Sequence, residues 1–156
     1  MENKGRWELE LNILWPFMIA LVSWIALNAI GKPVLQFLDL RREIRRTMLL
    51  YANVAARWTD RDWENVAIPE TSGNELSPDE SERLMQAQAQ YRDLGVQMRA
   101  FADTESPTCF FLKWFDFNPR KASSGLIGLS NSLSTYGKER AFHTKTVTDA
   151  LAFPEG

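Results

Sequence analysis

The chain has 156 residues, of which 45% are hydrophobic and 24% charged, and its formal net charge is −2. Eight glycines and seven prolines are too few for a wholly disordered or collagen-like chain. A single cysteine, Cys109, excludes an internal disulfide and a cysteine-based zinc cluster, and it suits a reducing compartment. The length allows one modest domain, or a membrane segment followed by a small helical domain.

Charge is distributed unevenly along the chain. Residues 32–57 carry six basic and two acidic side chains, and residues 107–145 carry the same numbers. Between them, residues 58–106 carry eleven acidic and four basic side chains. This pattern indicates that the two basic blocks either face an anionic surface or pack on the acidic middle block.

The first predicted element is an apolar helix. Residues 11–31 contain no charged side chain. As a helix, residues 13–31 would be about 28 Å long, close to the roughly 30 Å thickness of a hydrocarbon layer. The only plainly polar members, Ser23 and Asn28, can be accommodated beside another helix or at an interface. We therefore predict a transmembrane helix over residues 11–31, after a short extracytoplasmic N-terminus of residues 1–10.

Two other interpretations of this stretch fit less well. A cleaved signal peptide would begin with a basic segment, whereas residues 1–10 carry two basic and three acidic side chains. The small-x-small cleavage pattern is also poor, because Leu27 lies two residues before Ala29. A buried core helix would need a surface that covers it on all sides, which a chain of this length hardly provides.

The flanks of the apolar stretch predict its orientation. A lysine and four arginines follow it within 15 residues, whereas the segment before it is net acidic. The positive-inside rule therefore places residues 32–156 in the cytoplasm, as the domain of a single-pass protein of the cell (inner) membrane. Pro33 disfavours helical geometry at Lys32, so we predict a hinge there, at the membrane exit.

Residues 34–57 are predicted to form the second helix. Apolar residues recur at spacings of three and four and form one stripe, made of Phe37, Leu40, Ile44, Met48, Tyr51 and Ala55. Four candidate contact residues lie mostly off this stripe, and they are Arg41, Arg42, Arg45 and Arg46. They would either contact anionic headgroups, at about 1 kcal/mol each, or serve only as flanking charge that sets the topology.

A third helix is predicted over residues 78–104. Ser77 and Glu80 form a capping box, and Pro78 takes the first helical position. An a/d repeat follows, made of Leu84, Ala87, Tyr91, Leu94, Met98 and Phe101. Together with residues 34–57, this helix is expected to form an antiparallel hairpin, and an intermolecular coiled coil is the alternative.

Residues 109–121 combine aromatic and basic side chains. The candidate contact residues of this stretch are Phe110, Phe111, Trp114 and Phe115. The simplest interpretation is that they plug the open end of the hairpin. They could instead lie in the lipid interface, where aromatic residues beside basic ones are favourable, or bind a protein partner.

The last elements are a helix over residues 119–136 and a short tail helix over residues 139–151. Asn118 before Pro119 is a helix cap. Gly125 and Gly128 give the first of these helices a small-residue face, for which we expect close packing against the hairpin. They do not form a phosphate loop, because the Gly-Lys-Ser/Thr arrangement is missing.

No catalytic or metal-binding arrangement is predicted, and no cofactor. His143 is the single histidine, so no histidine pair or Ser-His-Asp group can form, and it is expected to be solvated. Cys109 beside two phenylalanines is expected to be a small buried hydrophobe. The alternating acids at residues 60–64 resemble a fragment of a calcium loop but lack its glycine and distant glutamate. An enzyme would have to rely on carboxylates and on Tyr51, Tyr91 or Tyr136.

The predicted fold class is all-α, with one N-terminal transmembrane helix and a small antiparallel helical-hairpin domain of three to four helices. The predicted function is that of a non-enzymatic membrane-anchored protein acting through protein contacts, as an adaptor, accessory subunit or regulator of a membrane complex. Its partners would be the lipid bilayer and a membrane protein or a second copy, and no nucleic acid is expected. The alternative is a membrane-active or lipid-binding effector that uses residues 109–121.

Overall fold

The computed structural model describes residues 4–54, 57–58 and 76–154. In chain order its elements are α1 (Lys4–Ala26), the π-helix η1 (Leu27–Gly31), α2 (Lys32–Leu50), β1 (Arg57–Trp58), α3 (Pro78–Thr104), α4 (Ser106–Lys113), α5 (Pro119–Ser132), β2 (Thr135–Tyr136) and α6 (Lys138–Ala150). The two strands have two residues each and pair in parallel. The described chain is otherwise built from helices, which confirms the predicted all-α class.

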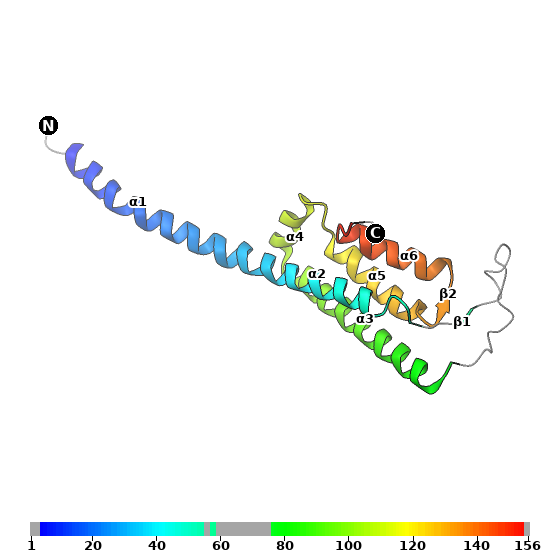
Figure 1. Ribbon diagram of the computed structural model, residues 1–156. Helices are drawn as coiled ribbons and strands as arrows, with labels where there is room; N and C mark the ends of the chain where they lie inside the picture. Colours follow the sequence, from blue (N-terminus) through cyan, green and yellow to red (C-terminus); the bar gives the residue numbers. More distant parts are fainter. Residues whose placement is uncertain (1–3, 55–56, 59–75, 155–156) are drawn as a thin grey trace.

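The helices α1, η1 and α2 follow one another without a break, and α1 extends away from the rest of the protein (Figure 1). The hinge predicted at Lys32 is therefore wrong. Lys32 has helical torsion angles, with φ −62° and ψ −49°, and its N–H donates to the carbonyl of Leu27. This hydrogen bond reaches back five residues instead of four, which widens the turn. Pro33 has no N–H, so the helix continues through it with one backbone hydrogen bond fewer.

The apolar part of this long helix has no cover within the described protein. One helix, Leu14–Leu50, is long and apolar enough to cross a membrane, and no residue in its apolar stretch is buried. Trp24, for example, is 64% exposed. The amide of Asn28 donates to the carbonyl of Trp24 at 2.7 Å, so this polar side chain is satisfied within the helix itself. The stretch is thus no core helix of the described domain.

The helical domain is centred on α5, which packs extensively against α3 on one side and α6 on the other (Figure 1). Small residues bring these helices close together. The hydroxyl of Ser123 in α5 donates to the carbonyl of Gly95 in α3 at 2.8 Å. A Cβ added at Gly125 would lie 2.8 Å from Cγ2 of Val147 in α6. The close packing predicted for Gly125 and Gly128 is therefore present, but the helix that these glycines face is α6 and not the predicted hairpin.

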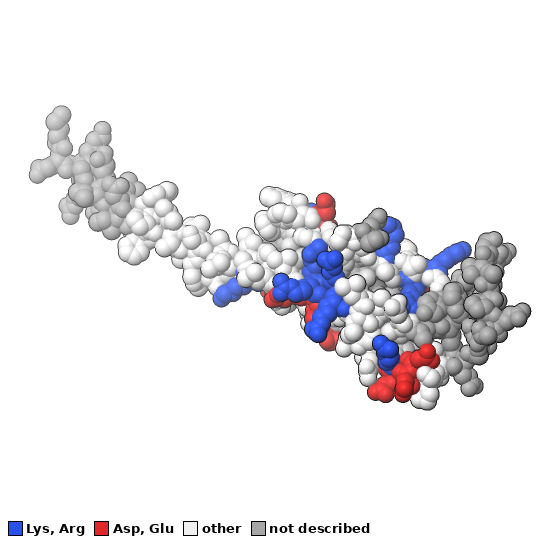
Figure 2. Space-filling view, in the orientation of Figure 1, with Lys and Arg blue, Asp and Glu red and all other residues white. Residues whose placement is uncertain are grey.

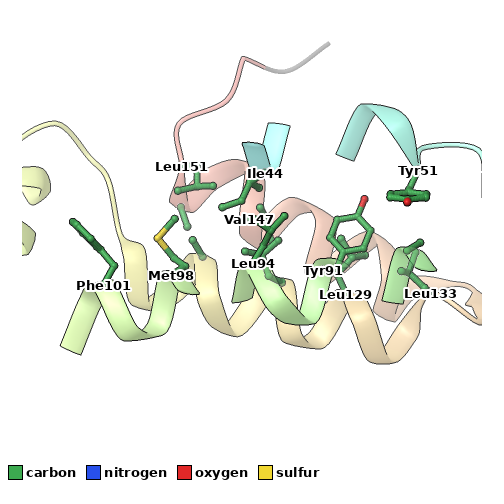
Figure 3. Packing of buried hydrophobic residues seen from close by; sticks show 14 of the residues in the cluster. Ile44, Tyr51, Tyr91, Leu94, Met98, Phe101, Leu129, Leu133, Val147 and Leu151 are labelled. Atoms are coloured by element: carbon green, nitrogen blue, oxygen red, sulfur yellow. The ribbon is translucent and has the colours of Figure 1, made fainter. Parts of the chain in front are cut away.

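The core draws side chains from α2, α3, α5 and α6 into one cluster (Figure 3). All six residues of the predicted a/d repeat in α3 are buried. On α2 the predicted stripe is buried at Phe37, Ile44 and Tyr51 and partly buried at Leu40 and Met48, while its last member, Ala55, lies outside the described residues. Periodicity alone therefore identified the inward faces of these two helices.

Contacts between α2 and α3 occur at both ends of α2. The ring of Phe37 lies 5.9 Å from that of Phe101, and the ring of Tyr51 lies 6.3 Å from that of Tyr91. These pairs place the beginning of α2 beside the end of α3. The packing between these two helices is less extensive than that between α3 and α5.

Two helices begin at the capping signals that the sequence showed. The capping box of Ser77 and Glu80 is formed in both directions at the start of α3. The side chain of Asn118 accepts from the N–H of Lys121 at the start of α5. Two helices end earlier than predicted. α2 ends at Leu50 instead of residue 57, and α5 ends at Ser132 instead of residue 136.

Candidate functional site

The four arginines of α2 have different environments. Arg41 reaches the end of α6, where its guanidinium donates to the carbonyls of Leu151 at 2.8 Å and Ala152 at 3.0 Å. It also lies over the rings of Phe117 and Phe153, at 5.3 and 5.0 Å from their centroids. Arg41 therefore holds the end of α6 on α2. Its role as a membrane or partner contact stays a prediction.

The other three arginines lie on the surface. Arg42 and Arg46 are 4.0 and 3.9 Å from Asp39 and Glu43, in exposed pairs that contribute little to stability. Arg45 is exposed and lies 6.0 Å from the ring centroid of Phe153. Figure 2 shows basic side chains gathered over α2 and acidic ones over the start of α3. A basic surface on α2 is therefore available for contacts.

The aromatic residues of the 109–121 stretch do not plug the end of a hairpin. Phe110 and Phe111 lie on α4, and Trp114 and Phe115 follow its last residue. Phe110 is 65% exposed, Trp114 74% and Phe115 56%. The buried residues of α4 are Thr108 and Leu112. The plug interpretation is wrong because a short helix can bury only one face, and here the smaller residues occupy it.

These rings contact one another. We define the α4 aromatic cluster as Phe110, Phe111, Trp114 and Phe115. Ring centroids lie 6.1 Å apart for Phe110 and Trp114, 6.3 Å for Phe111 and Trp114, and 5.2 Å for Phe111 and Phe115. The cluster is thus one connected and largely exposed apolar surface, of the kind that marks a contact site.

Sequence reasoning missed a groove between α2 and α3. Its volume is about 1080 Å³. Apolar residues along it include Leu40, Leu94 and Phe101. Its charged lining residues are Lys32, Asp39, Glu43, Asp93 and Glu105. The groove is therefore lined partly by apolar residues, and its charged lining residues are mostly acidic. The only sequence signal was the spacing of Asp39 and Glu43 on one side of α2, which does not reveal the facing acids of α3.

The titratable groups of the core show no reactive arrangement among the described residues. Cys109 is half-buried, whereas the sequence predicted a buried residue, and this partial burial raises the pKa of its thiol, which keeps it protonated and a weak nucleophile. Burial also raises the pKa of Tyr91 to about 12, and its hydroxyl donates to the carbonyl of Thr47 at 3.5 Å. A phenol held neutral in this way is unsuited to act as a general base.

His143 is half-buried, whereas the sequence predicted a solvated side chain. Its ring lies against Gly128, where a Cβ would collide with it. His143 therefore serves the packing of α6 on α5. The glycine at this position allows the ring to fit, which a sequence without known contacts could not indicate.

The described residues contain no group of three histidine, cysteine, aspartate or glutamate side chains that could hold a metal ion. The acids at residues 60–64, which resemble a fragment of a calcium loop, lie outside the described residues. Comparisons of the chain with protein-family models, with curated proteins and with solved structures found no match.

Proposed function

We propose that this chain is a single-pass membrane protein whose helical domain acts through protein contacts, as an adaptor, accessory subunit or regulator of a membrane complex. The observation that carries the proposal is the apolar helix, which continues from η1 into the folded domain and has no buried residue in its apolar stretch. Exposing such a surface to water would cost roughly 25 cal/mol for each Å². A bilayer is the solvent that removes this cost.

The proposed topology places the helical domain in the cytoplasm of the cell (inner) membrane. Support comes from Lys32 and from the exposed arginines of α2, which follow the apolar stretch directly. Basic residues within about 15–20 residues of a span favour the cytoplasmic side. We further propose that α2 and α3 form an antiparallel hairpin, which is connected to the span through the start of α2.

The α2–α3 groove is the proposed contact surface. Its apolar residues and four acidic side chains suit an amphipathic helix with basic edges, presented by another membrane protein. Charge argues against a second copy in the same groove, because a symmetric contact would bring acids such as Asp39 and Asp93 towards their own equivalents. Groove residues outside the charged set, such as Gln97, would contact the same partner helix.

Membrane integration is tested by alkaline extraction of membranes, followed by flotation in a density gradient. The full-length chain should float with the vesicles. Replacing Ile19 and Val22 together by arginine should release it, since each arginine near the centre of a span costs about 2.5–3.5 kcal/mol. The matched control replaces the exposed Leu38 and Leu49 of α2 by arginine and should still float. A wild-type chain that stays out of the floating fraction would overturn the proposal.

The contact surface is tested by a photo-crosslinking residue at Gln97 in the groove. The control carries the same residue at Phe142 of α6, which is exposed and lies outside the groove. We expect a discrete crosslink to a membrane protein from position 97, absent from position 142 and lost when Asp39 and Asp93 are both changed to lysine. The same products from both positions, or only crosslinked copies of this chain, would contradict the proposed groove contact.

A further inference from the structure

The α4 helix lies beside the junction between the apolar helix and the domain. It packs against η1 and α2. Its buried Thr108 donates through its hydroxyl to the carbonyl of Ala29 in η1, at 3.4 Å. Ala29 lies two residues before the end of the uncharged stretch, or about 3 Å along the helix axis. The position of α4 is therefore tied to the level at which the apolar helix meets the folded domain.

The two faces of α4 have opposite character at this level. Thr108 and Leu112 face the protein and are buried. The α4 aromatic cluster, on α4 and directly after its end, is largely exposed, and Lys113 beside it is exposed as well. Tryptophan and phenylalanine next to a basic side chain are favourable at the boundary between headgroups and acyl chains.

We propose that the α4 aromatic cluster lies in the headgroup region of the same membrane that the apolar helix spans. The cluster then acts as a second, interfacial contact that fixes the height and orientation of the helical domain. The occupant of this surface is lipid, because the contact between Thr108 and Ala29 holds α4 at the level where the span leaves the bilayer. This inference rests on the proposed function, since it requires the apolar helix to be in a bilayer.

The depth of single tryptophans in vesicles of phosphatidylcholine and phosphatidylglycerol tests the inference. Three full-length variants each contain a single tryptophan, and every other native tryptophan is changed to phenylalanine. The first keeps Trp24 of the span, the second keeps Trp114, and the third carries Phe142→Trp as a control, because Phe142 is as exposed as Phe110 but lies on α6. Quenching is measured with lipids brominated near the headgroup, with lipids brominated near the bilayer centre, and with aqueous iodide.

We expect Trp24 to lose most of its fluorescence to bromines near the bilayer centre. Trp114 should lose most of its fluorescence to bromines near the headgroup, while the control should respond only to iodide. If Trp24 is quenched by lipid and Trp114 behaves like the control, the inference fails and the anchor stands. If Trp114 responds to neither lipid nor iodide, protein covers the cluster and the inference also fails. If Trp24 is not quenched by lipid, the proposed function fails with it.

A second measurement avoids the multiple tryptophan changes. In a Cys109→Ser background, a nitroxide is attached at Trp114→Cys or at Phe142→Cys. A label in the headgroup region should collide more with oxygen and less with a water-soluble nickel complex than the label at position 142. Equal accessibility at both positions would overturn the inference, whereas the span is tested separately by a label at Ile25→Cys.

Discussion

The hydroxyl of Thr108 in α4 donates to the carbonyl of Ala29 in η1, across 79 residues of sequence. Ala29 lies four residues before Pro33, which has no N–H and cannot make the hydrogen bond that an α-helix would normally provide there. The hydroxyl of Thr108 therefore donates a hydrogen bond to a carbonyl to which Pro33 cannot donate. This contact ties α4 to the junction at which the apolar helix continues into α2.

A double-mutant cycle tests this relationship. Thr108→Val keeps the shape of the side chain but removes the donor, and we expect it to lower the free energy of unfolding by about 1–3 kcal/mol. Pro33→Ala restores an N–H four residues after Ala29, so the same valine substitution should cost less in that background. Denaturant unfolding in mild detergent measures both. The control Thr104→Val removes an exposed intrahelical hydrogen bond and should change stability little. An equal cost of Thr108→Val in both backgrounds would contradict the account.

Arg41 should be a stabilising residue, unlike its neighbour Arg42. Arg41→Lys loses the two-pronged contact with the carbonyls of Leu151 and Ala152 and the stacking on aromatic rings, so we expect a loss of about 1–2 kcal/mol. Arg42→Lys is the matched control on the same helix. Because Arg42 is exposed and only weakly paired, its change should stay within about 0.5 kcal/mol. Similar thermal midpoints for the two variants would show that Arg41 does not hold α6.

The close approach of α5 and α6 should make Gly125 intolerant of a methyl group. Gly125→Ala gains about 1 kcal/mol of helix propensity, but its Cβ would lie 2.8 Å from Val147, and overpacking costs about 1–3 kcal/mol. The net effect is a lower thermal midpoint. In a Val147→Ala background the clash is relieved, so the same substitution should become neutral or stabilising. Stabilisation by Gly125→Ala in the wild-type chain would mean that the two helices are further apart than described.

The capping box of α3 should make stability depend on acid pH. A hydrogen bond from the backbone of Ser77 lowers the pKa of Glu80 below its ordinary value. The stabilisation is therefore complete above the unfolded pKa, about 4.3, and is lost as the pH falls through the lower folded pKa. The thermal midpoint of Glu80→Gln should lie below that of the wild type at pH 7, and the difference should shrink in acid. A difference that grows as the pH falls would contradict this assignment.

Local sequence signals predicted the parts of the fold that depend on neighbouring residues. The start of α3 followed from Ser77 and Glu80, which lie three residues apart, and its buried face followed from a spacing of three and four. No local signal in the sequence predicted the tertiary arrangement of the helices. The central position of α5 depends on Gly125 and on its contact with Val147, which a weak pattern of small residues could not specify.

The candidate contact residues illustrate the same limit. Arg41 and Arg42 are adjacent and identical in type, yet one reaches Leu151, 110 residues away, and the other faces solvent. Exposure of the α4 aromatic cluster likewise depends on which face Thr108 anchors. The α2–α3 groove combines acids from two helices, so it becomes visible only when those helices are placed side by side.

The central claim is that the apolar helix crosses a membrane and leaves the two ends of the chain on opposite sides. Two full-length variants in a Cys109→Ser background test it, one with Lys4→Cys and one with the exposed Met85→Cys of α3. Both variants are expressed in bacterial cells. The cells are converted to spheroplasts, which are then treated with a membrane-impermeant maleimide. We predict labelling of position 4 in intact spheroplasts and of position 85 only after permeabilisation. Labelling of both positions under the same condition would contradict the account.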